Sequence, residues 1–226
     1  MTTYLITGAN RGLGLEFARQ LSTRKDDTRI LATAREPEKA VDLQRLVHAV
    51  YPLDVADPKS IEKLADHVKD QPIDVLINNA GVSSKTNSIA TLDPEDMRVA
   101  FAVNAIGPLL VTKAVLKNLE AGQRKTVFNI TSQLGSIANN KGGSSYAYRG
   151  SKAALNQMSV CLANEKRKDG FICVVVHPGW VQTDMGGPNA TLKPEESIAA
   201  MIKLLDGLKA EDSGKFFNYD GKPMPW

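Results

Sequence analysis

A tyrosine and a lysine four residues apart, Tyr148 and Lys152, are the side chains best placed for acid–base chemistry. On a helix this spacing puts both on one face. A free tyrosine has a pKa of about 10 and is a poor base at neutral pH, whereas a nearby ammonium stabilises the phenolate and lowers that pKa. A tyrosine tuned in this way can give a proton to a carbonyl oxygen or take one from an alcohol. Tyr146 competes for the role, but the residue four positions after it is Gly150.

Ser132 supports the same chemistry. It follows an apolar run at residues 127–130, which we expect to be a buried strand. Ligands bind at the carboxyl ends of the strands in open parallel sheets. The hydroxyl of Ser132 is therefore expected where it can hydrogen-bond a substrate carbonyl and polarise it.

A glycine-rich loop follows the first apolar run. Gly8, Gly12 and Gly14 are spaced G-x-x-x-G-x-G, and an amphipathic stretch begins directly after them. Such a turn lets the backbone approach a pyrophosphate, and the helix that follows offers unpaired N–H groups to the anion. Glycines also serve simple tight turns. The position between a strand and a helix favours dinucleotide binding.

The end of the second apolar run indicates which dinucleotide binds. NAD enzymes usually carry an acid there, but this chain has Ala34 followed by Arg35. Arg35 can pair with a 2′-phosphate, and Arg11 in the glycine loop can add a second positive charge. The placement predicts NADP(H). Two alternatives stay open: both arginines are merely solvated, or a shift in register makes Glu36 the ribose-binding acid.

Short apolar runs alternate with longer amphipathic stretches along the whole chain. The expected strands are residues 4–6, 30–32, 75–77, 127–130 and 173–176, and the expected helices are residues 13–21, 61–68, 148–166, 195–208 and, as two helices separated near Gly107-Pro108, 94–119. Alternation of this kind is typical of a parallel sheet with helices on both faces. We predict an α/β fold: a single doubly wound Rossmann domain over residues 1–226, with a parallel sheet of about seven strands.

Composition excludes several function classes. The net charge is only +3 and no Lys/Arg block stands out, so a nucleic-acid partner is not expected. Cys161 and Cys173 form no CxxC pair or His/Cys cluster, so we expect no metal site and interpret both as buried, reduced core residues. The chain starts without a signal-peptide pattern, and we expect no apolar run long enough to span a bilayer. We therefore predict a cytoplasmic protein with no membrane partner.

Taken together, these motifs resemble the short-chain dehydrogenase/reductase family. They appear in the family's order and span nearly the whole chain: residues 7–14, Asp54-Val55, Asn78-Asn79-Ala80-Gly81, Asn104, residues 132–135, Tyr148-x-x-x-Lys152 and Pro178-Gly179. Within the family the chain is more similar to the C-factor-like and sniffer-like carbonyl reductases, through residues 10–14, 143–152 and 214–226.

The resemblance implies a role for each motif. The catalytic residues would be Asn104, Ser132, Tyr148 and Lys152, with Asn104 holding a water that relays protons to Lys152. Lys152 would also bind the nicotinamide ribose, Asp54 and Val55 the adenine, and Thr183 the carboxamide. The implied cofactor-binding residues are Gly8, Asn10, Arg11, Gly12, Leu13, Gly14, Arg35, Asp54, Val55, Asn78, Ala80, Gly81, Tyr148, Lys152, Pro178, Gly179, Val181 and Thr183.

Each of these residues has a structural alternative. Asp54 could only cap a turn, Asn78 could be a turn residue, Asn104 could mark a helix kink before Gly107-Pro108, and Thr183 could be a surface residue. We expect His177, beside Pro178, to be structural rather than catalytic.

The sequence thus predicts an NADP(H)-dependent oxidoreductase that reduces a small-molecule carbonyl to the alcohol. The segment at residues 184–193 is short, which favours an open site and small or flat substrates such as aldehydes, ketones or quinones. The alternative is a cofactor-binding regulatory protein with little turnover; an epimerase or dehydratase would normally need a larger substrate domain. The resemblance also implies a homodimer or homotetramer built on the helices at residues 108–119 and 148–166.

Overall fold

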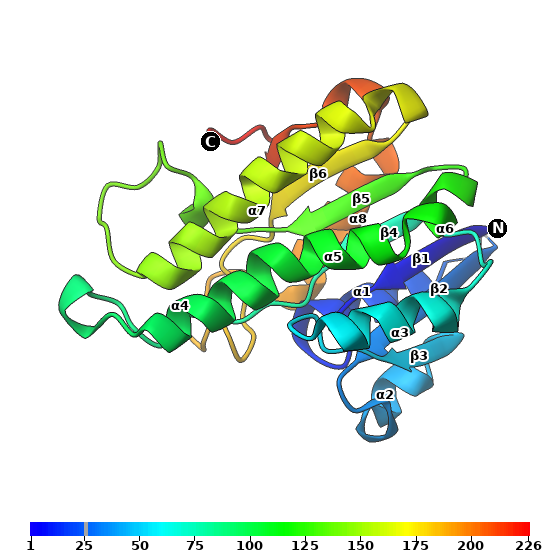
Figure 1. Ribbon diagram of the computed structural model, residues 1–226, viewed down its shortest axis with the longest axis horizontal. Coiled ribbons are helices and arrows are strands. Elements are labelled where there is room, and N and C mark those ends of the chain that lie inside the picture. The colour runs from blue at the N-terminus through cyan, green and yellow to red at the C-terminus, as the bar shows by residue number, and fades with distance from the viewer. Residues whose placement is uncertain (25–26) are drawn as a thin grey trace.

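The computed structural model describes residues 1–24 and 27–226. Seven strands form one parallel sheet in the order β3-β2-β1-β4-β5-β6-β7 (Figure 1). The strands are β1 (Thr2–Ile6), β2 (Thr28–Ala34), β3 (Ala49–Pro52), β4 (Val75–Asn78), β5 (Thr126–Ile130), β6 (Ile172–His177) and β7 (Phe216–Asn218). The strand order reverses between β1 and β4, which is where doubly wound sheets bind ligands. The predicted fold class is confirmed.

Helices cover both faces of the sheet. They are α1 (Gly12–Ser22), α2 (Val41–Gln44), α3 (Pro58–Val68), α4 (Pro94–Phe101), α5 (Gly107–Ala114), α6 (Leu116–Ala121), α7 (Tyr146–Glu165) and α8 (Pro194–Gly207). Buried side chains of α1, α2 and α8 share one core cluster, and those of α3, α5, α6 and α7 share the other. Figure 1 shows these two helical layers in front of and behind the sheet.

The strands alternate their side chains between these two cores. In β1, Tyr4 and Ile6 belong to the cluster with α1 and α8, whereas Leu5 belongs to the cluster with α3. All three side chains are fully buried. A strand buried on both faces must be apolar at every position, which is why these strands appear in the sequence as continuous apolar runs.

The region from Pro94 to Ala114 differs from the expected pair of helices. Gly107-Pro108 does not separate them; α4 continues through a π-helical turn, η3 (Ala102–Ile106), into α5. Pro108 has no N–H to donate to the carbonyl of Asn104 one turn earlier, and its ring crowds that carbonyl. The widened π turn takes up this conflict, so the helix bulges at residues 102–106 instead of ending. The break falls later, at Val115.

The same helix bears on the expectation that no apolar run is long enough to span a bilayer. By length and composition alone, the helix Pro94–Ala114 is long and apolar enough to cross a bilayer. Its position gives another reason for that composition, because α4 and α5 pack against α7 and α3 on one face of the sheet. We interpret it as a core helix.

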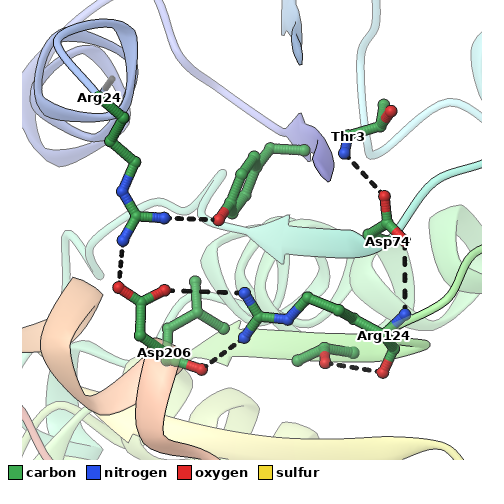
Figure 2. Close-up of polar contacts among 8 residues, drawn as sticks. Thr3, Arg24, Asp74, Arg124 and Asp206 are labelled. Carbon is green, nitrogen blue, oxygen red and sulfur yellow. Dashed lines mark hydrogen bonds and ion pairs between the residues drawn. The ribbon is translucent and has the colours of Figure 1, made fainter. Parts of the chain in front are cut away.

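A polar network lies at the end of the sheet where the strands begin, as Figure 2 shows. Arg24 donates to Tyr4 Oη and pairs with Asp206 of α8. Arg124 pairs with the same carboxylate at 3.6 Å and donates to the carbonyl of Leu205. This network joins the segment after α1, α8 and the residues before β5 at the end of the sheet opposite the carboxyl ends of its strands.

The two cysteines have different environments. Cys173 is buried in β6, as expected, and burial raises the pKa of its thiol to about 12. Cys161 is exposed on α7. The expectation that both are core residues is therefore wrong for Cys161, which lies on the solvent side of its helix.

Candidate active site

A cleft of about 470 Å³ opens at the carboxyl ends of the strands. This volume lies within the usual range of small-molecule sites. Its wall is built by the segments that follow β1 to β6 and by the start of α7. The lining residues are Gly8, Asn10, Arg11, Gly12, Leu13, Arg35, Glu36, Leu53, Asp54, Val55, Asn79, Ala80, Gly81, Val82, Val103, Ile130, Thr131, Tyr148, Lys152, Pro178, Thr183, Asp184 and Met185.

The glycine loop forms one end of this cleft. Gly8 has φ +62°, and a Cβ there would lie 2.9 Å from the Cα of Ala80, so only glycine lets β1 turn this closely past β4. Arg11 stands at the N-cap of α1 and its side chain makes no capping bond. The first turn of α1 carries no acidic residue. The positive end of the helix is thus available to an anion in the cleft.

Arg35 and Glu36 both line the cleft just past the end of β2. Glu36 accepts a hydrogen bond from Lys39 Nζ at 2.7 Å, so its charge is already compensated. Arg11 lies 3.5 Å from Asp184, which comes from the segment after β6 on the other side of the cleft. This end of the cleft therefore presents two arginines from separate loops to a ligand, with a carboxylate competing for one of them.

Tyr148 and Lys152 lie on the first turns of α7, and both line the cleft. Lys152 is buried, and its Nζ donates to the carbonyl of Ile130 at 2.8 Å. The same Nζ lies 5.9 Å from the centre of the Tyr148 ring. Burial lowers the pKa of Lys152 to about 8. The competing residue, Tyr146, is exposed and absent from the cleft wall described above.

Ser132 follows β5 and reaches Tyr148 from the neighbouring segment. Its Oγ accepts a hydrogen bond from the N–H of Leu134 at 3.1 Å, which caps the short turn η4 (Gln133–Gly135). That bond occupies an acceptor site of the hydroxyl and leaves its proton free to be donated. A hydrogen bond from Ser132 to Tyr148 lowers the pKa of the tyrosine, because it stabilises the phenolate.

The net shift of Tyr148 is opposite to the expected one. Burial raises its pKa above 10 and outweighs the opposing hydrogen bond from Ser132. The spacing predicted a lowered pKa because of the ammonium of Lys152. Here that ammonium is directed to the carbonyl of Ile130, and desolvation of the phenol dominates. Tyr148 is therefore protonated at neutral pH.

Asn104 lies in the π turn η3 and is completely buried. Its Oδ1 accepts from the N–H of Val82 at 2.9 Å, and its Nδ2 donates to the Val82 carbonyl and to Ser151 Oγ. A Cβ on Gly81 would lie 3.3 Å from Asn104 Oδ1 and 3.8 Å from Lys152 Nζ. Asn104 thus marks an irregular helix turn, as its structural alternative proposed, and also joins the wall after β4 to α7 beside Lys152.

Four predicted cofactor residues lie outside the cleft wall. Gly14 is buried, and a Cβ there would lie 2.5 Å from the Gly8 carbonyl, so it serves packing between α1 and the loop. The buried Asn78 donates to Asn129 Oδ1 at 2.8 Å in the layer beneath the cleft. Gly179 packs against Leu192 and Tyr219, and the buried Val181 forms an isolated bridge to Leu192.

Asp54 and Thr183 fit both of their alternatives. Asp54 lines the cleft, and its Oδ1 also accepts from the N–H of Ala56 at 2.9 Å, which fixes the turn after β3. Thr183 lines the cleft, and its Oγ1 accepts from the N–H of Gly186 at 3.1 Å. His177 is buried and not part of the cleft wall, and burial lowers its pKa to about 4, so it is neutral at pH 7.

The cleft also contains residues that sequence reasoning missed. Leu53, Val82, Val103, Ile130, Thr131, Asp184 and Met185 line it in addition to the predicted set. Several directly follow or precede a predicted residue, as Thr131 precedes Ser132, so position beside a motif could have indicated them. Val103 likewise precedes the predicted Asn104, and it lies in the π turn of its helix.

Comparison with known proteins decides the family. The family model for short chain dehydrogenases matches residues 2–193. The chain belongs to the short-chain dehydrogenase/reductase family. It is 49% identical over 162 residues to C-signal of Myxococcus xanthus, covering 72% of this chain and 98% of that protein. The family resemblance in the sequence motifs is thus confirmed.

Two solved structures share the whole fold of this family member. The carbonyl reductase Sniffer of D. melanogaster superposes with a TM-score of 0.95 at 33% identity and covers 100% of both chains. An NADPH-bound carbonyl reductase from chicken fatty liver superposes with a TM-score of 0.93 at 36% identity, covering 100% of this chain and 99% of the other. The predicted similarity to C-factor-like and sniffer-like carbonyl reductases is confirmed.

Proposed function

We propose that this protein is an NADP(H)-dependent reductase that converts a carbonyl group of a small molecule to an alcohol, with Tyr148, Lys152 and Ser132 as its catalytic residues. One observation supports this most strongly. Tyr148 and the buried Lys152 line the same cleft as the glycine loop and Arg35, and the Ser132 hydroxyl hydrogen-bonds to the tyrosine. The cleft therefore joins groups suited to proton transfer with groups suited to a phosphorylated cofactor.

The residues of the cleft fit NADP(H). The uncapped amino end of α1 suits the pyrophosphate, and Arg35 and Arg11 suit a 2′-phosphate, because guanidinium groups pair with phosphate oxygens. The chicken carbonyl reductase similar to this chain is an NADPH-bound structure. Asp54 and Val55 would hold the adenine, and Lys152 and Thr183 the nicotinamide end. When bound, NADPH supplies the hydride for the reduction.

Tyr148 acts as the general acid in this proposal. Because burial raises its pKa, the phenol carries its proton at neutral pH and gives it to the substrate oxygen as that oxygen becomes an alkoxide. The proton moves from Tyr148 Oη to the former carbonyl oxygen, and the phenolate left behind is stabilised by the Ser132 hydroxyl and the Lys152 ammonium. Ser132 also donates to the carbonyl oxygen before the transfer, which polarises the C=O bond.

Lys152 supplies positive charge at a fixed place. With a pKa of about 8, it is mostly an ammonium at pH 7, and the Ile130 carbonyl fixes its direction. Buried charge acts strongly because little water screens it. We propose that this charge lowers the free energy of the phenolate once the proton has left. Lys152 then gives a proton to the phenolate of Tyr148 and regains one from a water at Asn104.

The substrate would be a small or flat carbonyl compound, such as an aldehyde, ketone or quinone. Apolar side chains of Val82, Val103 and Met185 line the cleft, and they favour a ligand with apolar surface. The segment after Thr183 is short and Met185 is half exposed, which leaves the entrance open.

Location and assembly complete the proposal. We propose a cytoplasmic protein, because an exposed free thiol such as that of Cys161 is typical of a reducing compartment.

We also propose a homodimer or homotetramer. Val99, Ile106 and Leu109 are exposed along the helix from Pro94 to Ala114, and apolar side chains of this kind favour a subunit contact. Sedimentation velocity tests the assembly.

The deciding experiment compares initial rates with NADPH and NADH on a panel of aldehydes, diketones and quinones. We expect turnover with NADPH well above that with NADH. Tyr148→Phe should abolish turnover while the Kd for NADPH, measured by protein fluorescence, stays within about three-fold of the parent. Full activity of Tyr148→Phe contradicts the proposed mechanism, and NADPH binding without turnover on any carbonyl favours the regulatory alternative.

A further inference from the structure

We infer that Asn156 is a positioning residue for Ser132: it holds the segment before and after this serine against α7, and thereby directs the serine hydroxyl into the site. The inference rests on the proposed role of Ser132. It concerns a residue one helical turn beyond Lys152, outside the cleft wall described above and without a place in the proton transfer itself.

Two hydrogen bonds carry the argument. Asn156 Oδ1 accepts from the hydroxyl of Thr131 at 2.7 Å, on one side of Ser132. Asn156 Nδ2 donates to the carbonyl of Gly135 at 3.3 Å, on the other side. A single amide group, itself buried, thus contacts the segment both before and after the serine.

Lys152 extends this contact by one turn of the helix. Its Nζ donates to the carbonyl of Ile130, and side chains four residues apart lie on one face of a helix. Successive turns of α7 therefore hold residues 130, 131 and 135. The position of Ser132 follows from these bonds, which hold the residues before and after it against α7.

The packing leaves little freedom for this segment. A Cβ on Gly135 would lie 2.9 Å from Lys152 Cβ and 3.2 Å from Asn156 Nδ2, so the backbone lies directly on the helix. Ser132 Oγ accepts from the N–H of Leu134, which orients the hydroxyl. If the segment moves, this turn moves with it, and the donor no longer points at the position of the substrate oxygen.

Asn156→Ala removes both bonds and should lower kcat by about 10- to 100-fold, the loss that small displacements of a catalytic group produce. The KM and Kd for NADPH should change by less than about two-fold, because Asn156 lies outside the cofactor residues. Thr131→Val, which removes only the hydroxyl that Asn156 Oδ1 accepts from, should lower kcat in the same direction by a smaller factor.

Ser159→Ala is the matched control. Ser159 is also buried on α7, and its bonds go to Asn129 within β5 and to the carbonyl of Leu155 rather than to Thr131 or Gly135. It should lower Tm by an amount similar to Asn156→Ala but leave kcat nearly unchanged. A loss of kcat in Ser159→Ala equal to that in Asn156→Ala would mean that general destabilisation of α7 is the cause, and would overturn the inference.

A double-mutant cycle with Ser132→Ala decides whether Asn156 acts through Ser132. We expect Ser132→Ala to lower kcat by about 10²- to 10³-fold, as loss of a donor to the substrate oxygen does. The double variant should then have the same kcat as Ser132→Ala alone, because Asn156 has no effect once the hydroxyl that it positions is absent. If the two effects multiply, Asn156 acts independently of Ser132 and the inference is wrong.

The two hypotheses fail in distinguishable ways. If Ser132→Ala retains full activity, the proposed function of Ser132 fails. Hydrogen–deuterium exchange then tests the contact without any activity: Asn156→Ala should speed exchange of the amides at residues 131–136 by about ten-fold or more, and Ser159→Ala should not. Unchanged exchange in Asn156→Ala would overturn the inference by itself.

Discussion

Replacing the buried ammonium of Lys152 should make the protein more stable and inactive. Lys152→Met keeps the length and apolar stem of the side chain but removes its charge. Burial lowers the pKa of this lysine from 10.5 to about 8, which corresponds to about 3 kcal/mol by which the fold disfavours the ammonium. Loss of the bond to the Ile130 carbonyl costs about 1 kcal/mol in return. The expected net gain at pH 7 is about 2 kcal/mol.

The pH dependence of the free energy of unfolding tests this prediction independently. Below pH 8 the lysine is charged in both states, and the full burial penalty weakens the fold. Between pH 8 and 10.5 the unfolded chain still holds the proton that the folded chain has released, so the free energy of unfolding rises with pH. The wild-type protein should gain up to about 3 kcal/mol from this group over that range. Lys152→Met should lack this rise.

Thermal and urea unfolding of the ligand-free protein measure both effects. A gain of about 2 kcal/mol raises Tm by roughly 4–8 °C for a chain of this size. Lys117→Met, which removes an exposed lysine, should change stability by less than about 0.5 kcal/mol. Two results would contradict this reasoning. One is a lower free energy of unfolding for Lys152→Met than for the wild type at pH 7. The other is a free energy of unfolding of Lys152→Met that rises between pH 8 and 10.5 as much as that of the wild type. Turnover should be lost in either case.

The remaining predictions concern the cofactor end of the cleft. Arg35→Ala should weaken NADPH binding by about ten-fold or more, as loss of a hydrogen bond to a charged group does, and leave NADH binding unchanged; equal losses for both cofactors would exclude a contact with the 2′-phosphate. Asp184→Asn should tighten NADPH binding by about two- to five-fold by freeing Arg11 from an exposed ion pair, and the gain should vanish in about 1 M salt. Tighter binding that persists at high salt would point to another cause.

The periodicity of apolar residues predicted most of the fold, because the central strands are buried on both faces. The positions of β3 and β7 were not predicted, although a sheet of about seven strands was. β3 is mostly half-buried, so its residues form no continuous apolar run. β7 has only three residues, fewer than a pattern needs. The π turn before Pro108 was also not predicted, because a proline within a helical pattern usually ends or kinks the helix.

Much of the candidate site was predictable for a topological reason. In a parallel sheet the carboxyl ends of all strands meet at one edge, so motifs far apart in sequence converge there. Spacing says nothing about how deeply a side chain is buried, and burial decides the pKa of Tyr148. For the same reason the sequence assigned Gly14 and Asn78 to the cofactor, whereas the structure places them one layer below the cleft wall.

The start of α7, which carries Tyr148, depends on a contact that no local pattern indicates. Ser145 precedes the helix with φ +48° and ψ +45°, a left-handed conformation that is unfavourable for serine. Its N–H donates to the Asn87 carbonyl at 3.2 Å, and its Oγ lies 3.0 Å from Asn87 Oδ1. A conformation of this kind persists only where surrounding contacts fix it. The loop after β4 supplies those contacts.

That loop is in turn held by a single carboxylate. Asp96 of α4 accepts from Ser84 Oγ, from the N–H of Lys85 and from Thr86 Oγ1, and these hydrogen bonds, that from Ser84 foremost, lower its pKa to about 2. Asp96 therefore keeps its charge and its partners at every pH at which the protein would work. Residues 84–86 bond to Asp96 of α4, and Asn87 bonds to Ser145 at the beginning of α7. Contacts made by another segment therefore fix the start of α7 and, with it, the direction in which Tyr148 points into the cleft.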